Sequence, residues 1–263
     1  MLSFPSRAED LQKDDLPFAI GEQLSFNIHY KWGFIMARAG SAHYSITAGK
    51  YDGKPTYQST LCFRTTSGFD KIYKIRDTLV SHVNMAIKPV YHIKHLHEGS
   101  TNYVEDIQFL KFGEDKTIAT SRRRLADGST RFEETLEAQG IAYDMLNIFM
   151  FVRSLNYSKL SPGAVLPMSS FVGRDVVQMN ARYIGQVILK KGGDNYKALK
   201  FELDIVDKAF ETEKTAMELW ISDDLNRYPL KMKAKLKIGA AEVDLVSFKG
   251  NKYPLSSLVT TKK

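Results

Sequence analysis

Residues 220–239 read WISDDLNRYPLKMKAKLKIG, and the second half of this stretch alternates strictly between lysine and apolar residues. The four lysines are Lys231, Lys233, Lys235 and Lys237. A period of two places successive side chains on opposite faces of a β-strand, so one face is charged and the other is apolar. The stretch therefore predicts an antiparallel strand with one face in solvent and the other on a core.

The next residues, Gly239-Ala240, predict a two-residue hairpin turn. In that register Lys237 lies opposite Glu242, and Lys235 lies opposite Asp244. Opposite charges in such cross-strand positions stabilise the pairing by roughly 0.2 to 1 kcal/mol each.

On the preceding side, a loop through residues 223–227 would place Glu218 opposite Lys233 and Trp220 opposite Lys231. Most of the lysines then have neighbouring side chains to contact. We therefore interpret the lysine row as the solvated side of a twisted sheet, in preference to a dedicated anion site.

The same period of two dominates the chain from Glu22 onward, with one exception. Runs such as QLSFNIHYKW and VEDIQFLKFG are separated by turn residues, among which Asp127-Gly128 is the strongest hairpin signal. The exception is IAYDMLNIFMFVRSLNYSKL, residues 141–160, where Asp144 can cap a helix and apolar residues recur at helical spacing. Because such a helix is apolar on most sides, it must be covered on most sides.

These patterns predict a mainly β fold: a large curved antiparallel sheet or half-open barrel packed around one buried apolar helix, at about residues 142–156. No Gly/Ser linker divides the chain, so we expect residues 16–263 to form a single β-rich domain. Two lobes, about residues 20–140 and 164–250, would be joined by the helix.

Residues 1–15 are expected to lie outside that domain. Their start, MLSFPSRAED, is similar to the tail of a secretory signal peptide, because small residues stand three and one positions before a potential cut. A disordered cytosolic terminus is the alternative interpretation. No apolar run reaches the roughly 18 residues needed to cross a bilayer.

The net charge of +7 combines 37 basic with 30 acidic residues mixed along the chain. This balance permits contact with an anionic surface but is not typical of nucleic-acid binding, so we expect no nucleic-acid partner. Cys62 is the one cysteine, which excludes an intramolecular disulfide, and its setting in QSTLCFRT predicts a small buried strand residue.

The chain carries no G-x-S-x-G, S-x-x-K, G-x-G-x-x-G, Walker or H-E-x-x-H motif, which lowers the expectation of an enzyme and leaves any catalytic residues unknown. His95 and His97 share a strand face, about 6 to 7 Å apart, whereas His92 points the other way. The pair is a weak metal candidate without further ligands, and we expect no metal or other cofactor.

Three stretches in order carry a resemblance: FDKIYKIRDTLVSHVNMAIKPVYH (69–92), YDMLNIFMFVRSL (143–155) and AMELWISDDLNRYPLKMKAKLKIGAAEVDL (216–245). Together they resemble the bacterial exported proteins of domain-of-unknown-function family 3108. This resemblance implies a signal peptide, a location in the periplasm or at the periphery of the outer membrane, and a β fold with no assigned activity. The last stretch is also similar to the carboxy-terminal hairpin of the LolA and LolB lipoprotein carriers, which implies, by analogy, an apolar cavity for acyl chains.

We therefore expect a non-catalytic cell-envelope binding or assembly protein that holds a lipid or other apolar ligand between sheet and helix. The candidate ligand-binding residues are Tyr73, Tyr91, Phe109, Phe149 and Val152. The same interface could also be an ordinary core. Other expected partners are an envelope protein or an anionic glycan or lipid surface. The alternative function is an envelope polysaccharide or peptidoglycan hydrolase that uses a carboxylate pair scattered in the sequence.

Overall fold

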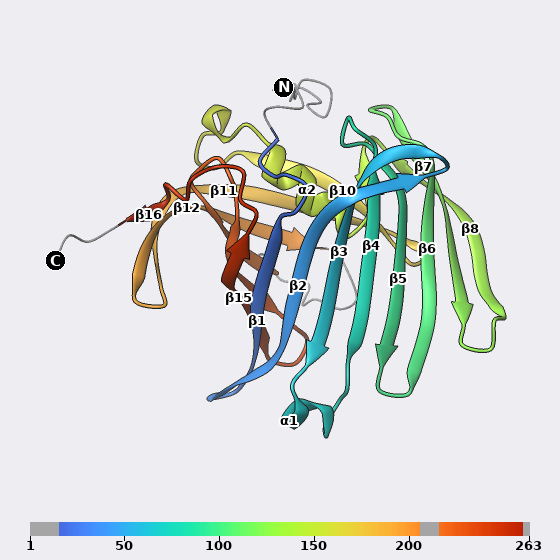
Figure 1. Ribbon diagram of the computed structural model, residues 1–263, viewed down its shortest axis with the longest axis horizontal. Helices are drawn as coiled ribbons and strands as arrows, with labels where there is room; N and C mark the ends of the chain where they lie inside the picture. The colour runs from blue at the N-terminus through green and yellow to red at the C-terminus, as the bar shows by residue number, and fades with distance from the viewer. Residues whose placement is uncertain (1–15, 206–215, 260–263) are drawn as a thin grey trace.

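Strands make up most of the computed structural model, which describes residues 16–205 and 216–259 (Figure 1). The first half contains β1 (Gln23–Trp32), β2 (Ile35–Tyr51), β3 (Lys54–Thr65), α1 (Ser67–Asp70), β4 (Arg76–Val83), β5 (Pro89–Glu98), β6 (Thr101–Lys111), β7 (Lys116–Leu125) and β8 (Thr130–Gln139). The second half contains β9 (Ala142–Tyr143), α2 (Asn147–Ser154), the 3-10 turn η2 (Tyr157–Lys159), β10 (Val165–Val172), β11 (Asp175–Lys191), β12 (Asp194–Ile205), β13 (Met217–Ser222), β14 (Pro229–Lys235), β15 (Ala240–Lys249) and β16 (Leu258–Val259). The predicted mainly β fold is confirmed.

The strands form one sheet with the order β8-β7-β6-β5-β4-β3-β2-β1-β15-β14-β13-β12-β11-β10-β9, and β16 pairs with β12. Neighbours along this path are antiparallel, except that β9 runs parallel to β10. β1 therefore lies in the middle of the sheet and joins the two halves of the chain.

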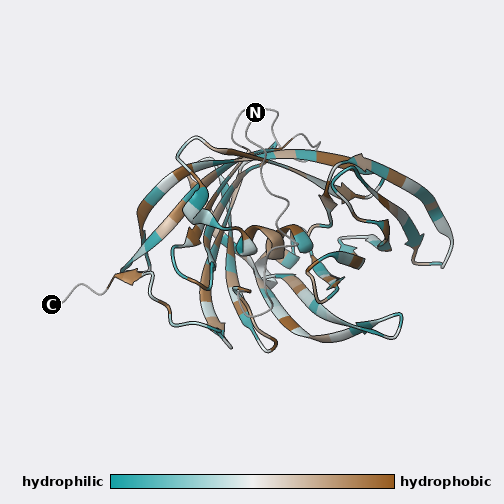
Figure 2. Ribbon diagram, turned by 90° about the horizontal axis from the view of Figure 1, so that it is seen from above, coloured by the Kyte–Doolittle hydropathy of each residue, from teal (hydrophilic) through white to brown (hydrophobic). Residues whose placement is uncertain are grey.

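The sheet curls around α2 into a nearly closed barrel (Figure 2). The turn after β10 reaches across to the inner side of β6 and β7, where the Ser121 hydroxyl donates to the Gly173 carbonyl at 2.6 Å. The Gly173 amide in turn donates to the Glu105 carboxylate at 3.2 Å. These contacts connect the two ends of the sheet, although β8 and β9 are not paired with each other.

The predicted helix at 142–156 is present only over Asn147–Ser154, and a buried apolar helix is not confirmed. The residues that α2 buries most deeply are Asn147, Met150 and Arg153, and two of these three side chains are polar. The helix starts late because the Asp144 carboxylate accepts from the amides of Leu146 and Asn147, both at 2.9 Å, in a capping turn. It ends at Leu155, whose backbone is extended. Within the described residues no helix combines the length and hydropathy needed to cross a bilayer.

The core lies on the inner face of the sheet in clusters that meet at α2. Phe149 packs edge-on against Tyr44 with ring centroids 4.9 Å apart, in the cluster formed mainly by β1 to β3. Phe151 stacks on Tyr143 at 4.7 Å and belongs to the cluster formed mainly by β10 to β13. A short helix therefore fills the space between the two halves of the sheet.

The lysine row lies on the outer face, but the predicted turn was wrong. Lys231 pairs with Asp244 and Lys233 with Glu242, four residues out of the predicted register. The connection is a longer turn closed by the Leu236 amide on the Gly239 carbonyl at 3.1 Å. Because four is an even number, the charged and apolar faces stay the same.

The predicted pairing on the other side of β14 is confirmed: Glu218 lies opposite Lys233 and Trp220 opposite Lys231. The Lys231 ammonium lies 2.7 Å from the Glu242 carboxylate and 3.5 Å from that of Asp244. Two of the four lysines of the row, Lys231 and Lys233, are thus paired with acids. The division into two lobes stays a prediction, and residues 1–15 lie outside the described residues.

Candidate functional site

A row of apolar side chains crosses the inner face of four neighbouring strands. Ile28 lies opposite Val243, Val243 opposite Met232, and Met232 opposite Leu219. Ile28 and Val243 pack against one core cluster and Leu219 against the other, which places the row on the same side of the sheet as α2. All four side chains are only half-buried. We call these four residues the apolar row.

Burial decreases along the inner face from the α2 end towards the α1 end. On β1, Leu24 and Phe26 are buried, whereas Ile28 and Tyr30, further along the strand, are half-buried. On β3, Tyr57 is buried, whereas the apolar inner residues Leu61 and Phe63, further towards α1, are half-buried. Solvent therefore reaches the inner apolar face from the α1 end of the barrel, which is the property that a ligand-binding face requires.

The α2 end is closed by a buried ion pair between Arg153 and Glu22. The guanidinium donates to both carboxylate oxygens, at 2.5 and 2.8 Å, and also to the backbone carbonyls of Pro17 and Asn226. Burial acts to lower the pKa of Arg153, but the adjacent Glu22 carboxylate holds it above its usual value. One side chain thus ties together α2, the segment before β1 and the β13–β14 loop.

A second buried polar cluster fixes the start of α2 to β4 and β5. The Ser81 hydroxyl donates to the Asp144 carboxylate at 2.7 Å and lies 2.7 Å from His92 Nδ1. His92 Nδ1 is itself 3.4 Å from the same carboxylate. Burial lowers the pKa of the His92 imidazole, while Asp144 acts in the opposite direction.

Serine, histidine and aspartate are the residue types of a hydrolytic triad, but this arrangement does not fit that chemistry. In a triad the histidine uses one ring nitrogen for the serine and the other for the aspartate. Here Nδ1 of His92 faces both groups, and Ser81 is completely buried. The cluster is a structural connection between the sheet and the helix.

Three of the predicted ligand-binding residues point into the barrel. Phe149 and Val152 lie on α2 and pack against the two core clusters. Phe109 lies on β6 and packs against Phe171 of β10, with ring centroids 5.9 Å apart. The structure brings Phe149 and Val152 together on one helix but places Phe109 in a separate cluster.

The other two predicted residues lie elsewhere. Tyr91 points to the outer side of β5 and stacks on Tyr51 at 4.9 Å. Tyr73 follows α1, is 47% exposed and donates to the Glu98 carboxylate at 3.5 Å. A ligand on the inner face of the sheet would not contact Tyr91. The role of all five residues in ligand binding stays a prediction.

His95 and His97 are exposed on the outer face of β5, and His92 lies on the opposite face, as predicted, where it points inward. The His97 amide donates to the Asp77 carboxylate at 2.9 Å. In the described part of the chain, no group of three or more His, Cys, Asp or Glu side chains is placed to hold a metal ion.

Reasoning from the sequence did not identify the buried pair Arg153 and Glu22. The available signal was Arg153 itself, a charged residue within the apolar run NIFMFVRS, since a buried charge needs a partner. Its partner could not be predicted because the two residues are 131 positions apart.

The arginine cluster of β7 is divided between the two faces of the sheet. Arg122 and Arg124 contact Asp106 on the outer face at 3.1 and 2.9 Å, whereas Arg123 contacts Glu105 on the inner face at 2.5 Å. The three guanidinium groups therefore do not form one acid-binding patch.

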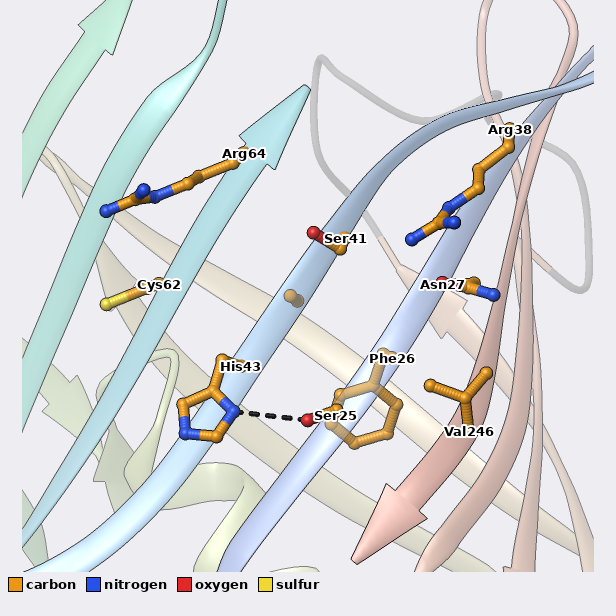
Figure 3. A pocket seen from close by; sticks show the side chains of 10 residues that line it. Ser25, Phe26, Asn27, Arg38, Ser41, His43, Cys62, Arg64 and Val246 are labelled. Carbon is orange, nitrogen blue, oxygen red and sulfur yellow. Dashed lines mark hydrogen bonds between the residues drawn. The ribbon is translucent and has the colours of Figure 1, made fainter. Parts of the chain in front are cut away.

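A pocket of about 410 Å³ lies on the outer face of β1 to β3 (Figure 3). Its lining residues are Ser25, Phe26, Asn27, Arg38, Ser41, Ala42, His43, Cys62, Arg64 and Val246. Ser25 and His43 share a hydrogen bond of 3.2 Å, and Arg38 and Arg64 lie on opposite sides of Ser41. Cys62 lies on a strand as predicted, but it is half-buried here and not part of the core.

Comparison with protein families matches residues 25–246 to the family described as "Protein of unknown function (DUF3108)". No curated protein matches the chain. Among solved structures, the crystal structure of a β-barrel-like protein of domain of unknown function DUF1849 from Brucella abortus is similar, with a TM-score of 0.59 and 10% sequence identity. The alignment covers 89% of this chain and 99% of that one. The likeness shows a shared barrel-like fold, and the resemblance to LolA and LolB is not confirmed.

Proposed function

This chain belongs to the DUF3108 family, and we propose that it is a non-catalytic binding protein that holds an apolar ligand, such as a lipid acyl chain, on the inner face of its sheet. We place this role in the cell envelope, in the periplasm or at the outer membrane, as the resemblance to exported proteins implies. The ligand site that we propose is the apolar row together with the side of α2 that faces it.

The half-buried apolar row is the observation that carries this proposal. Ile28, Val243 and Met232 point into the barrel, yet they are not covered by other side chains as Phe26 is. Each methylene group that such a surface removes from water stabilises the complex by about 0.8 kcal/mol. An extended acyl chain lying across the row would therefore gain several kcal/mol without any polar contact.

The hydrolase alternative has weaker support from the geometry. Asp77 and Glu98 are neighbouring carboxyl groups near α1, and burial together with Asp77 raises the pKa of Glu98. However, the two side chains hydrogen-bond to each other. The carboxylate pairs of glycosidases are about 5 to 10 Å apart, to leave room for the sugar or a water molecule.

The test is binding of a fluorescent fatty acid, 11-(dansylamino)undecanoic acid, to the purified chain, with native mass spectrometry of the protein as isolated. We expect saturable binding that a Val243→Gln or Met232→Gln substitution weakens about tenfold, equivalent to 1.4 kcal/mol. Val246→Gln is the matched control, since Val246 is on the same strand but exposed on the outer side. Absence of saturable binding to the wild-type chain would refute the proposal.

A further inference from the structure

The β1–β2 hairpin ends in a group of exposed apolar side chains, WGFIM, residues 32–36. Trp32 is 65% exposed, Phe34 108%, Ile35 65% and Met36 50%. Trp32 pairs with Ile35 across the strands, and residues 33–34 form the turn. The hairpin projects from the sheet at the α1 end of the barrel (Figure 1). We call residues 32–36 the apolar tip.

More exposed apolar side chains lie at the same end of the barrel. Ile238, in the β14–β15 turn, is 68% exposed, and its carbonyl accepts from the Tyr30 hydroxyl at 2.8 Å. Ile72, just after α1, is 79% exposed. Phe69 of α1 contacts Tyr30 with ring centroids 6.4 Å apart, so the three segments are neighbours.

Basic side chains flank these apolar groups. Lys31 and Arg38 lie on the strands of the hairpin. Lys235 ends β14, Lys237 lies in the β14–β15 turn, and Lys71 and Lys74 lie beside Ile72. None of these six side chains forms an ion pair with another described residue. The lysines of β14 that lie further from this end, Lys231 and Lys233, are by contrast paired with acids.

An exposed apolar group surrounded by unpaired cations is complementary to the surface of an anionic bilayer. Tryptophan and tyrosine favour the interface between headgroups and acyl chains. Each lysine or arginine near an anionic surface adds to the electrostatic attraction. A stable interface with a protein partner instead buries about 800 Å² on each side, usually on one continuous face. A projecting tip of five residues fits a deformable lipid surface better than such a face.

We infer that the apolar tip inserts into a lipid bilayer that contains anionic phospholipids, with Ile72 and Ile238 beside it and the flanking lysines on the headgroups. The partly open end of the inner face would then be directed towards the membrane. This inference uses a surface that the proposed ligand site does not share, so either one can fail while the other holds.

The experiment is co-sedimentation of the full chain with phosphatidylcholine vesicles, prepared with and without about one third phosphatidylglycerol. We expect binding to the anionic vesicles, and weaker binding at high salt because the Debye length falls from about 10 Å at 0.1 M to about 3 Å at 1 M. In a Trp220→Phe background, the remaining Trp32 should show blue-shifted emission on these vesicles.

A Phe34→Ser substitution should weaken vesicle binding about tenfold, and Lys235→Gln with Lys237→Gln should reduce the dependence on anionic lipid. The matched controls are Leu110→Ser and the pair Lys50→Gln with Lys54→Gln, which alter exposed residues at the opposite end of the sheet and should leave binding unchanged. Phe34→Ser should still bind the fluorescent fatty acid, and Val243→Gln should still bind vesicles.

Three results would overturn the inference. The first is no binding of the wild-type chain to anionic vesicles, and the second is equal loss of binding in Leu110→Ser and Phe34→Ser. The third is self-association of the wild-type chain in analytical ultracentrifugation that Phe34→Ser abolishes, without any vesicle binding, since the tip would then contact a second copy of the chain.

Discussion

The guanidinium of Arg153 and the carboxylate of Glu22 form an ion pair with an N–O distance of 2.5 Å. The two side chains are only 1% and 0% exposed to solvent. The rings of Phe18, Phe149 and Tyr228 surround the guanidinium at 5.3 to 5.6 Å. The charges are therefore isolated from water at the closed end of the barrel, and each charge depends on the other for its stability.

Removing one partner of this pair should destabilise the protein strongly. We expect Arg153→Met to lower the free energy of unfolding by about 3 to 5 kcal/mol, because Glu22 would remain as an uncompensated buried charge. The double variant Arg153→Met with Glu22→Leu should lose less free energy of unfolding than the two single variants lose in sum. Urea denaturation measures these values.

Arg174→Gln is the control, since its ion pair with Glu134 is largely exposed. It should change the stability by less than about 1 kcal/mol. Equal effects of Arg153→Met and Arg174→Gln would contradict the structural role of the buried pair.

The capping turn at Asp144 gives a second prediction. Asp144→Ala removes the acceptor of two helix amides and of the Ser81 hydroxyl, all of which are buried. We expect a loss of about 2 to 4 kcal/mol in the free energy of unfolding, from the cap and the unsatisfied donors together. Asp127→Ala, in an exposed hairpin turn, should have a much smaller effect, and similar losses in both variants would argue against a capping role.

His92 should make the stability dependent on pH. Burial lowers its pKa from 6.5 in the folded state and Lys94 acts in the same direction, against the partly opposing effects of Asp144 and Glu105. The unfolded chain therefore binds a proton near pH 6.5 that the folded chain does not, so stability is lost as the pH falls below about 6.5.

His92→Gln should reduce the slope of unfolding free energy against pH in this window, whereas His95→Gln, at an exposed position, should not. Urea denaturation at several pH values between neutral and mildly acidic gives the slopes. Identical slopes for wild type and His92→Gln would show that the pKa of His92 is the same in the folded and the unfolded chain.

Gly239 gives a prediction about the β14–β15 turn. Its φ of +75° is in the region that favours glycine, and an added Cβ would collide with the backbone carbonyl of Lys31. Gly193, in the β11–β12 turn, has a φ of +90° but no atom near the added Cβ. Both alanine substitutions carry the conformational cost of about 1 to 2 kcal/mol for a positive φ. Because of the additional collision, Gly239→Ala should lower the melting temperature clearly more than Gly193→Ala does. Equal losses would exclude the close approach to β1.

The alternation of apolar and polar residues was sufficient to predict the fold class and the two faces of most strands. It did not predict the turn after β14, because the sequence does not show that Gly239 lies against the backbone of Lys31, more than 200 residues earlier. The helix was predicted too long because the apolar residues before Asn147 belong to β9 and to the capping turn.

The candidate site was less predictable than the fold. Aromatic content indicated Tyr91 as well as Phe149, but only the strand register shows that Tyr91 faces outward. The apolar tip could not be predicted from the sequence either, because Trp32 continues the alternating pattern of β1. Only the three-dimensional structure shows that the hairpin extends beyond the covered part of the sheet.

The central place of β1 has a consequence for the order of events during synthesis. β1 leaves the ribosome well before one of its two neighbours, β15, and must wait for that strand until β2 to β14 have been made. Folds dominated by such distant pairings form slowly, in about milliseconds to seconds. Until then an unpaired strand edge is open to other chains, so a newly made molecule depends on a chaperone or on rapid completion to avoid aggregation.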